Sequence, residues 1–419
     1  MSERSSARST HIFGEPLVRE PLVREPLEDS ASANSELAQA AHGYNSRGLD
    51  PSKRGDDRVR VVAEFQIELL RYLDAQGHIV QELPRFAQDN QELLKMFGAM
   101  LRARVFDAKA INLQRTGKLG TYAPCLGQEA THVGVGAALQ PEDSVAIVYR
   151  EIGTMFWRGV RMTDVLMYWG GDERGNDFAG PKHDFPWCVP IATQTLHAAG
   201  AAMAFKIRKE PRCAVAYIGD GGTSEGSFYE AINLAGAKHL PIVFMIVNNK
   251  WAISVPIEEQ TAAKTLAQKA IAAGIPGMQV DGNDVIAVRD CVARAAEKAR
   301  SGGGPTVIEA LSYRLSDHTT ADDATRYRPA SEVEEAWKVE PLVRLRKLLM
   351  ERGVLDEARE QAMKAEYSRE VEAAVQEYLG TAKQSTDAMF DYLFANPPRH
   401  IAEQKDVARR YAGTGRPSH

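Results

Sequence analysis

The stretch CAVAYIGDGGTSEGSFYEAINLAGAKHLPIVFMIVNNKWAIS, from Cys213 to Ser254, decides the fold of this 419-residue chain. Its two apolar runs, CAVAYI and PIVFMIV, are short and nearly free of polar residues. Such runs are typical of parallel strands that helices cover on both faces. The 26 residues from 222 to 247 give room for one helix and one strand. This strand–turn–helix–strand order predicts an α/β domain.

Polar residues follow each of the two predicted strands. Asp220 lies in a glycine turn after the first strand, and Asn248 and Asn249 follow the second. In an open α/β sheet, ligands bind just beyond the carboxyl ends of the strands. The flanking Gly221 and Gly222 let a phosphate group approach the backbone, and the next helix N-terminus favours negative charge. Because carboxylate and amide oxygens suit octahedral Mg²⁺, we predict a magnesium-diphosphate site here.

Helical and strand patterns alternate outward from this stretch, and two further helices are expected at about 332–352 and 356–379. Asn90 is expected to cap the first helix, and Thr223 or Ser224 the helix after the glycine turn. The alternation predicts a doubly wound, mainly parallel sheet with C-terminal helices. The expected helices are 90–115, 128–138, 162–169, 193–209, 224–237, 261–273 and 283–301, and the expected strands are 144–148, 213–218, 241–247, 277–280 and 305–313.

The composition excludes several classes of protein. The net charge of -5 comes from 51 basic and 56 acidic residues, so neither nucleic acid nor an anionic membrane is expected as a partner. Four widely spaced cysteines form no CxxC pair, which argues against a zinc site or a disulfide framework and favours a reducing compartment. No apolar run approaches the roughly 20 residues of a membrane span, and no signal core is present. We therefore expect a cytoplasmic protein.

The chain divides into three predicted regions. Residues 1–58, with the direct repeat EPLVR-EPLVR-EPL, are expected to be a disordered tail because regular prolines oppose a helix. A segment that tethers a partner protein is the alternative interpretation of this tail. Residues 59–380 are expected to form the α/β domain. Residues 381–419 are expected to form a C-terminal helix and tail that contact a partner.

The full motif GDGGTSEGSFYEAINLA followed by NNKWAIS resembles a thiamine diphosphate motif. It resembles in particular the alpha subunits of the decarboxylating components of 2-oxo acid dehydrogenases. The similarity spans about Val61 to Met350. It is especially close in KTLAQKAIAAGIPGMQVDGNDVIAV, from Lys264 to Val288, which looks like the pyruvate dehydrogenase type. The branched-chain type is similar in the loop YRLSDHTTADD.

The resemblance implies roles for residues of the central stretch. Asp220, the Asn249 amide oxygen and the Trp251 backbone carbonyl correspond to magnesium ligands, so thiamine diphosphate and Mg²⁺ are the implied cofactors. Gly221 and Gly222 correspond to residues that offer backbone to the diphosphate. Asn248 is not assigned a role, because a turn-forming residue is as reasonable an interpretation for it.

Residues outside the central stretch also match the family. Tyr149 and Arg150 resemble a pair that lies against the cofactor, and a guanidinium suits a diphosphate. Val189 and Ile191 lie in a segment that resembles the one beneath the aminopyrimidine ring. His318 lies in a loop that resembles the mobile active-site loop; it is expected to stabilise charge or to help receive the lipoyl group, since its pKa is expected near the working pH. A surface ion pair for Arg150 and a solvated loop histidine are the alternatives.

The function implied by the resemblance is the oxidative decarboxylation of pyruvate, with acyl transfer to a lipoyl-lysine. Branched-chain 2-oxo acids and acetoin are alternative substrates, and a non-catalytic assembly subunit is an alternative of another class. We identify no glutamate that could activate the cofactor, and in this family that residue belongs to a beta subunit. The implied partners are therefore a beta subunit, in an α2β2 heterotetramer, and a lipoyl-bearing acyltransferase core.

Overall fold

The computed structural model of the protein describes residues 61–412. The described residues from Gln66 onward form one compact unit, and Val61 to Phe65 belong to a separate unit. The predicted N-terminal tail and its repeat lie outside the described residues. Among the described helices, none is both long enough and apolar enough to cross a membrane. The four cysteines are unpaired.

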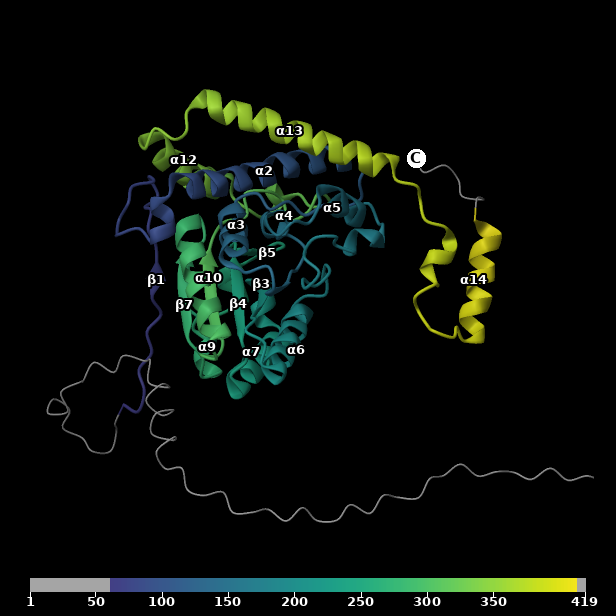
Figure 1. Cartoon of the computed structure of the whole chain (residues 1–419), viewed down its shortest axis with the longest axis horizontal. Helices are drawn as coiled ribbons and strands as arrows, with labels where there is room; N and C mark the ends of the chain where they lie inside the picture. Colours follow the sequence, from purple (N-terminus) through teal and green to yellow (C-terminus); the bar gives the residue numbers. More distant parts are fainter. Residues whose placement is uncertain (1–60, 413–419) are drawn as a thin grey trace, which may run out of the picture. The chain divides into compact units, whose positions relative to one another are not determined.

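A six-stranded sheet forms the centre of the compact unit (Figure 1). Its strands run in the order β1-β7-β8-β4-β3-β2, and every neighbouring pair is parallel. This confirms the predicted doubly wound α/β fold, and each expected strand is present. The strands are β1 (Leu69–Leu70), β2 (Ser144–Ala146), β3 (Ala214–Gly219), β4 (Ile242–Asn248), β7 (Gly277–Asp281) and β8 (Thr306–Leu311).

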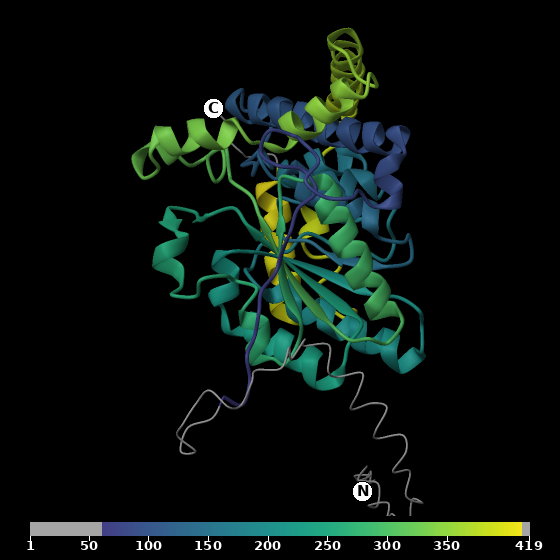
Figure 2. The same ribbon diagram turned by 90° about the vertical axis from the view of Figure 1, so that its left-hand side faces the viewer.

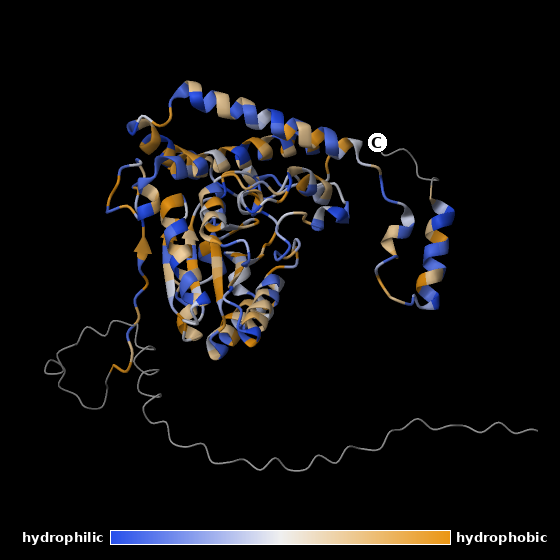
Figure 3. Ribbon diagram, viewed as in Figure 1, coloured by the Kyte–Doolittle hydropathy of each residue, from blue (hydrophilic) through white to orange (hydrophobic). Residues whose placement is uncertain are grey.

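Alternate residues of β3 and β4 contribute to two separate hydrophobic clusters, one on each face of the sheet. Because successive side chains of a strand point to opposite faces, a strand covered on both sides must be apolar throughout. Figure 3 shows this hydrophobic character along β4. The first cluster contains Val215, Tyr217, Val243, Met245 and Val247, and the second contains Ala214, Ala216, Ile218, Ile242, Phe244 and Ile246.

Helices supply much of the rest of both clusters. The first face is covered by α2 (Asn90–Arg115), α3 (Glu129–Ala138), α4 (Ile152–Trp157) and α10 (Val285–Arg300). The second face is covered by α6 (Thr193–Arg208), α7 (Gly226–Lys238) and α9 (Lys269–Ala272). Figures 1 and 2 show α12 (Pro341–Glu351) and α13 (Glu357–Gly380) beside α2. The remaining helices are α5 (Met162–Trp169), α8 (Ile257–Gln260), α11 (Ala330–Trp337) and α14 (Arg399–Tyr411).

Two predicted helices are wrong in extent. The helix expected over 261–273 is reduced to α9, because Thr265 and Gln268 exchange side chain–backbone hydrogen bonds of 3.0 and 3.2 Å, as in a capping box. A helix therefore begins only after this pair. The helix expected over 332–352 is divided into α11 and α12, since Pro341 lacks a backbone N–H and starts a new helix that the Glu340 carboxylate caps.

The predicted caps are also corrected. Asp89, and not Asn90, caps α2, because its carboxylate accepts a hydrogen bond from Gln91 N at 2.8 Å. Neither Thr223 nor Ser224 caps α7, whose N-cap position is Glu225, with no side-chain cap. The Thr223 hydroxyl instead donates to the Asp220 carbonyl, 2.7 Å away, and thereby stabilises the glycine turn.

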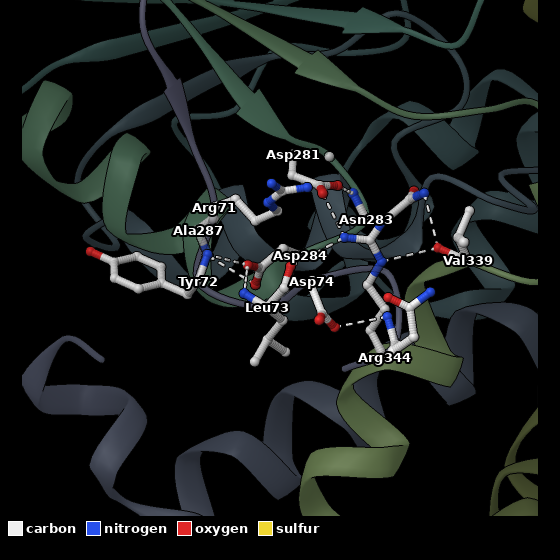
Figure 4. A network of polar contacts seen from close by, with 12 residues as sticks. Arg71, Tyr72, Leu73, Asp74, Asp281, Asn283, Asp284, Ala287, Val339 and Arg344 are labelled. Carbon is white, nitrogen blue, oxygen red and sulfur yellow. Dashed lines mark hydrogen bonds and ion pairs between the residues drawn. The ribbon is translucent and has the colours of Figure 1, made fainter. Parts of the chain in front are cut away.

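Asp284 joins the segment that follows β1 to the start of α10 (Figure 4). One oxygen of its buried carboxylate accepts from Tyr72 N and Leu73 N, both at 2.7 Å. The other accepts from Ile286 N and Ala287 N at the start of α10, at 3.0 and 3.2 Å. Burial raises the pKa of Asp284 to about 6. One side chain thus satisfies backbone donors from two distant segments.

We predict that Asp284→Ala lowers the free energy of unfolding by about 3 kcal/mol, because several buried N–H groups lose their acceptor. Thermal or urea unfolding of the purified chain measures this loss. Tyr72→Phe is the control, since it removes only the hydroxyl that donates to Asp290 at 2.9 Å. Equal losses in the two variants would contradict the assigned role of Asp284.

Candidate functional site

Asp220 lies directly after β3, at the carboxyl edge of the sheet. Gly219 pairs with Val247 across β3 and β4, so the residues that follow them come to the same edge. The Asp220 carboxylate is buried and accepts a hydrogen bond of 2.9 Å from the Gln260 amide. Burial raises the pKa of this carboxyl group. The register of two central strands therefore places the predicted acidic residue beside the predicted asparagines.

The two asparagines at the carboxyl end of β4 have different surroundings. The Asn248 side chain donates to Glu309 at 2.7 Å and accepts from Lys250 N at 3.2 Å, as a turn-forming residue does. The Asn249 side chain donates to the Gln128 oxygen at 3.3 Å, and its own oxygen accepts from Trp251 N at 3.2 Å. Asn249, and not Asn248, therefore has the side chain beside the backbone of Trp251.

Trp251 begins a short hairpin of β5 (Trp251–Ala252) and β6 (Val255–Pro256). A Cβ atom on Gly221 would lie 2.5 Å from the Cβ of Ala252, so the hairpin abuts the glycine turn and leaves no room for a side chain. The Trp251 carbonyl accepts from Arg314 at 3.1 Å. Because a carbonyl oxygen has two lone pairs, this bond leaves one position for another partner.

The segment before α6 lies against the glycine turn. A Cβ atom on Gly222 would lie 3.1 Å from the Ile191 side chain, which shows that these predicted residues are neighbours. Cys188 N donates to Val148 O at 3.0 Å, so this segment also runs beside the chain that leads to Tyr149. Val189 and Ile191 are 52% and 45% exposed, unlike the buried acid and amide.

Arg150 and His318 are brought together by direct contacts. Arg150 is buried and donates to Pro124 O at 2.7 Å and to His318 O at 3.0 Å. Its guanidinium also lies 3.2 Å from His318 Nδ1. The ring of Tyr149 meets the His318 ring edge to face, with centroids 6.1 Å apart. Neither alternative interpretation holds, since Arg150 is not a surface ion pair and His318 is not fully solvated.

The expectation that His318 titrates near neutral pH is wrong. Burial, together with the charges of Arg150 and Arg314, lowers the pKa of His318 to about 3. The imidazole is therefore neutral at physiological pH. Since Nδ1 faces guanidinium donors at 3.2 and 3.5 Å, the proton of the neutral ring lies on Nε2. His318 can thus donate a hydrogen bond from Nε2 without carrying a charge.

We predict that His318→Gln makes the chain less sensitive to acid. The folded-state pKa of about 3 lies below the value of roughly 6.5 expected for an unfolded histidine. Between these values the unfolded chain binds more protons, so stability falls as the pH falls through this window. Urea unfolding midpoints at about pH 7.5 and pH 5 measure the effect.

Stability of the wild-type chain should fall relative to His318→Gln at the lower pH. His183→Gln, which removes an exposed histidine, is the control. A constant difference between wild type and His318→Gln at both pH values would contradict the buried, neutral state of His318.

The sequence did not predict several residues that hold the site. Arg314 is fully buried and donates to the carbonyls of Trp251 and Ile253, at 3.1 and 2.7 Å. Lys269 is buried and donates to Thr223 O at 2.7 Å. Arg314 follows Tyr313 in the loop that resembles the family's active-site loop, so this resemblance could have pointed to Arg314. Lys269, inside the helix predicted over 261–273, gave no such signal.

Only a few kinds of oxygen atom among the candidate residues near the glycine turn could bind a metal ion. Among the described residues, no three His, Cys, Asp or Glu side chains gather into a group that could hold a metal. The candidate ligands are therefore one carboxylate, one amide oxygen and one backbone carbonyl. A separate cavity of about 390 Å³ lies beside the amino end of β2, and no candidate residue lines it.

Comparisons with known proteins place the chain in a family. Residues 98–386 match the model of the family described as dehydrogenase E1 component. A protein of Staphylococcus epidermidis (strain RP62A) is 40% identical over 354 residues, which cover 84% of this chain and 96% of that protein. A protein of Staphylococcus aureus (strain Mu50) is 39% identical over the same shares. Both relatives are named pyruvate dehydrogenase E1 component subunit alpha. The family match includes every candidate site residue.

Proposed function

This chain belongs to the dehydrogenase E1 component family, and we propose that it is the alpha subunit of a pyruvate dehydrogenase. In this role it would take part in thiamine diphosphate-dependent oxidative decarboxylation of pyruvate, with acyl transfer to lipoyl-lysine. The observation that carries the proposal is the meeting of Asp220, Asn249 and the Trp251 hairpin at one sheet edge. The names of the relatives support pyruvate as the substrate.

The metal assigned to this edge is Mg²⁺. Asp220, the Asn249 amide oxygen and the Trp251 carbonyl are the proposed protein ligands. All three are hard oxygen donors, and only one carries a charge, which suits a cation that shares a diphosphate with the protein. The absence of room at Gly221 supports the fit, since backbone rather than side chain lines the turn. Gly221 and Gly222 are proposed to offer that backbone to the diphosphate.

The remaining site residues are proposed to bind and orient the cofactor. Arg150 supplies a buried guanidinium, which suits phosphate oxygens. Tyr149 packs against His318 and fixes the ring plane. Val189 and Ile191 offer half-exposed apolar surface, which suits the underside of an aminopyrimidine ring.

The cofactor, when bound, supplies the carbon nucleophile and the electron sink for decarboxylation. The chain contributes position and electrostatics. His318 is the proposed catalytic residue, because its neutral ring can donate from Nε2 to an anionic oxygen. Two guanidinium groups on the Nδ1 side maintain the neutral form. A donor that stays uncharged can stabilise developing negative charge without giving up a proton.

We predict that Asp220→Ala weakens binding of thiamine diphosphate by about 100-fold in the presence of Mg²⁺, because the metal loses its only protein carboxylate. Calorimetry of the complex with the beta subunit measures the affinity. Asp177→Ala removes an exposed carboxylate that pairs with Lys182 and serves as the control. Unchanged affinity in Asp220→Ala would show that the metal assignment is wrong.

A beta-type subunit is the proposed partner at this site. Exposed apolar side chains surround the turn and the hairpin, and they are Val189, Ile191, Ile253 and Val255. Exposed apolar side chains close to a binding site are typical of sites of protein contact. A partner that covers it could also supply the glutamate that this sequence does not identifiably provide. The proposed assembly is an α2β2 heterotetramer that serves a lipoyl-bearing acyltransferase core in the cytoplasm.

The C-terminal arm, residues 386–412, is a second proposed contact with a partner. None of its residues is buried, although it forms α14 and a 3-10 turn at Thr386–Met389. Tyr392 is 95% exposed, and Met389, Leu393, Phe394 and Tyr411 are exposed as well. Isolated helices of fewer than about 12–15 residues are marginal in water. An arm that exposes these apolar side chains and has no core of its own is therefore expected to be stabilised by a neighbouring chain.

The assay that tests the proposed function compares pyruvate with 3-methyl-2-oxobutanoate. We predict that the chain turns over neither substrate alone. With its beta-type partner, thiamine diphosphate and Mg²⁺, kcat/KM should favour pyruvate by about 10-fold or more. Omission of the partner is the control. A preference for the branched substrate would reassign the substrate class, and turnover by the isolated chain would contradict the half-site.

A further inference from the structure

The segment from Tyr122 to Gln128 connects α2 to α3, and none of the roles proposed above uses it. We call it the strap. Its backbone contacts two parts of the candidate site. Pro124 O accepts from Arg150 at 2.7 Å, and Leu126 O accepts from Leu315 N at 3.1 Å. Tyr122 exchanges two hydrogen bonds with Thr320, of 2.9 and 3.0 Å. The strap therefore joins the arginine to the loop that carries His318.

Buried carboxyl groups anchor the strap to the core. The Asp107 carboxylate on α2 accepts from the Tyr122 hydroxyl at 2.5 Å and from Cys125 N at 2.7 Å. The Glu129 carboxylate accepts from Gly127 N at 2.9 Å. Gly127 has a φ of +91°, and a Cβ atom there would lie 2.2 Å from Tyr313 O, so only glycine fits. These contacts fix the strap from both sides.

Gln128 ends the strap beside the candidate metal ligand. It is 1% exposed, and its backbone N donates to Cys125 O at 2.9 Å. Its side-chain oxygen accepts from the Asn249 nitrogen at 3.3 Å. On the other side of the same amide, Trp251 N donates to the Asn249 oxygen at 3.2 Å. The Gln128 oxygen accepts and Trp251 N donates. The Asn249 amide nitrogen must therefore face Gln128, and its oxygen must face Trp251.

Core packing alone does not explain why the buried side chain at position 128 is an amide. Its nitrogen is buried and has no hydrogen-bond partner among the described residues. A buried amide is costly unless its groups are paired, so an apolar side chain would be the simpler choice for packing alone. Within residues 61–412, the one hydrogen bond of this side chain joins it to Asn249. Because this side chain bonds a candidate metal ligand, a role at the candidate metal site fits it better than a packing role in the core.

We propose that Gln128 is a positioning residue for the metal: it holds the Asn249 side chain so that the amide oxygen, rather than the amide nitrogen, is presented to the cation. The inference rests on the proposed function, since it takes Asn249 as a ligand. Gln128 itself does not touch the metal. It acts through Asn249, and the strap transmits the same restraint to Arg150 and the His318 loop.

The test is the Mg²⁺ concentration needed for half-maximal binding of thiamine diphosphate, measured by calorimetry on the complex with the beta subunit. Gln128→Met keeps the length of the side chain but removes the acceptor, and it should raise this concentration about 10-fold or more. Gln128→Glu keeps an acceptor oxygen, and it should restore the value to within about 3-fold of wild type.

A matched control is Thr131→Val in α3, three residues further along the chain. It removes one buried hydrogen bond, from the Thr131 hydroxyl to Gly282 O at 3.0 Å, without touching a candidate ligand. This variant should leave the Mg²⁺ dependence unchanged even where the melting temperature falls. An equal rise in Mg²⁺ requirement in Thr131→Val and Gln128→Met would overturn the proposal.

A second arm uses Asn249→Asp. A carboxylate presents an oxygen whichever way it turns, so Gln128→Met in this background should change the Mg²⁺ requirement by less than about 3-fold. The same large effect in both backgrounds would overturn the proposal. So would a wild-type complex whose cofactor binding ignores Mg²⁺, which would also remove the proposed metal site. If the wild-type complex requires Mg²⁺ but Gln128→Met has the same Mg²⁺ requirement as wild type, the role of Gln128 is wrong and the metal site still stands.

Discussion

The parallel pairing of β3 with β4 is the constraint on which the rest of the site depends. Gly219 lies opposite Val247, so Asp220 and Asn249 leave the sheet at the same edge although 28 residues separate them in the chain. A shift of one residue would turn every side chain of a strand to the opposite face. Because both faces of these strands are packed into separate hydrophobic clusters, such a shift would disrupt both. Core packing thereby fixes the geometry of the candidate ligands.

Buried polar side chains extend this constraint to the loops. Glu309 on the neighbouring strand β8 accepts from Asn248, and also from Ala267 N at 2.9 Å. Arg314 joins the Trp251 hairpin to the His318 loop, and Gln128 joins Asn249 to the strap. Loss of one partner in such a network leaves a buried donor or acceptor unpaired, which costs more than the bond itself contributes. The loops are therefore held nearly as firmly as the strands.

The sequence predicted the parts of this arrangement that follow from periodicity and short motifs. Apolar runs located each expected strand, and the glycine turn located Asp220. It missed Gln128 and Lys269, because the partners that justify a buried polar residue lie far away in the chain. It also misjudged His318, whose pKa depends on two arginines, one of them 168 residues away. The predicted limits of α9 and α12 were wrong for local reasons. These are the capping pair at Thr265 for α9 and the proline at position 341 for α12.

The residues of the candidate site differ in how deeply they are buried, and this difference bears on how the cofactor would be held. Asp220, Asn249 and Arg150 are at most 7% exposed, whereas Val189 and Ile191, which are proposed to lie beneath the aminopyrimidine, are about half exposed. A charged diphosphate gains most from buried, prearranged partners, since electrostatic interactions strengthen where water is excluded. A reactive ring left on half-exposed apolar surface would be open to water. We propose that another chain excludes water from that half, so that the exposed apolar side chains there belong to the site as much as the buried acid does.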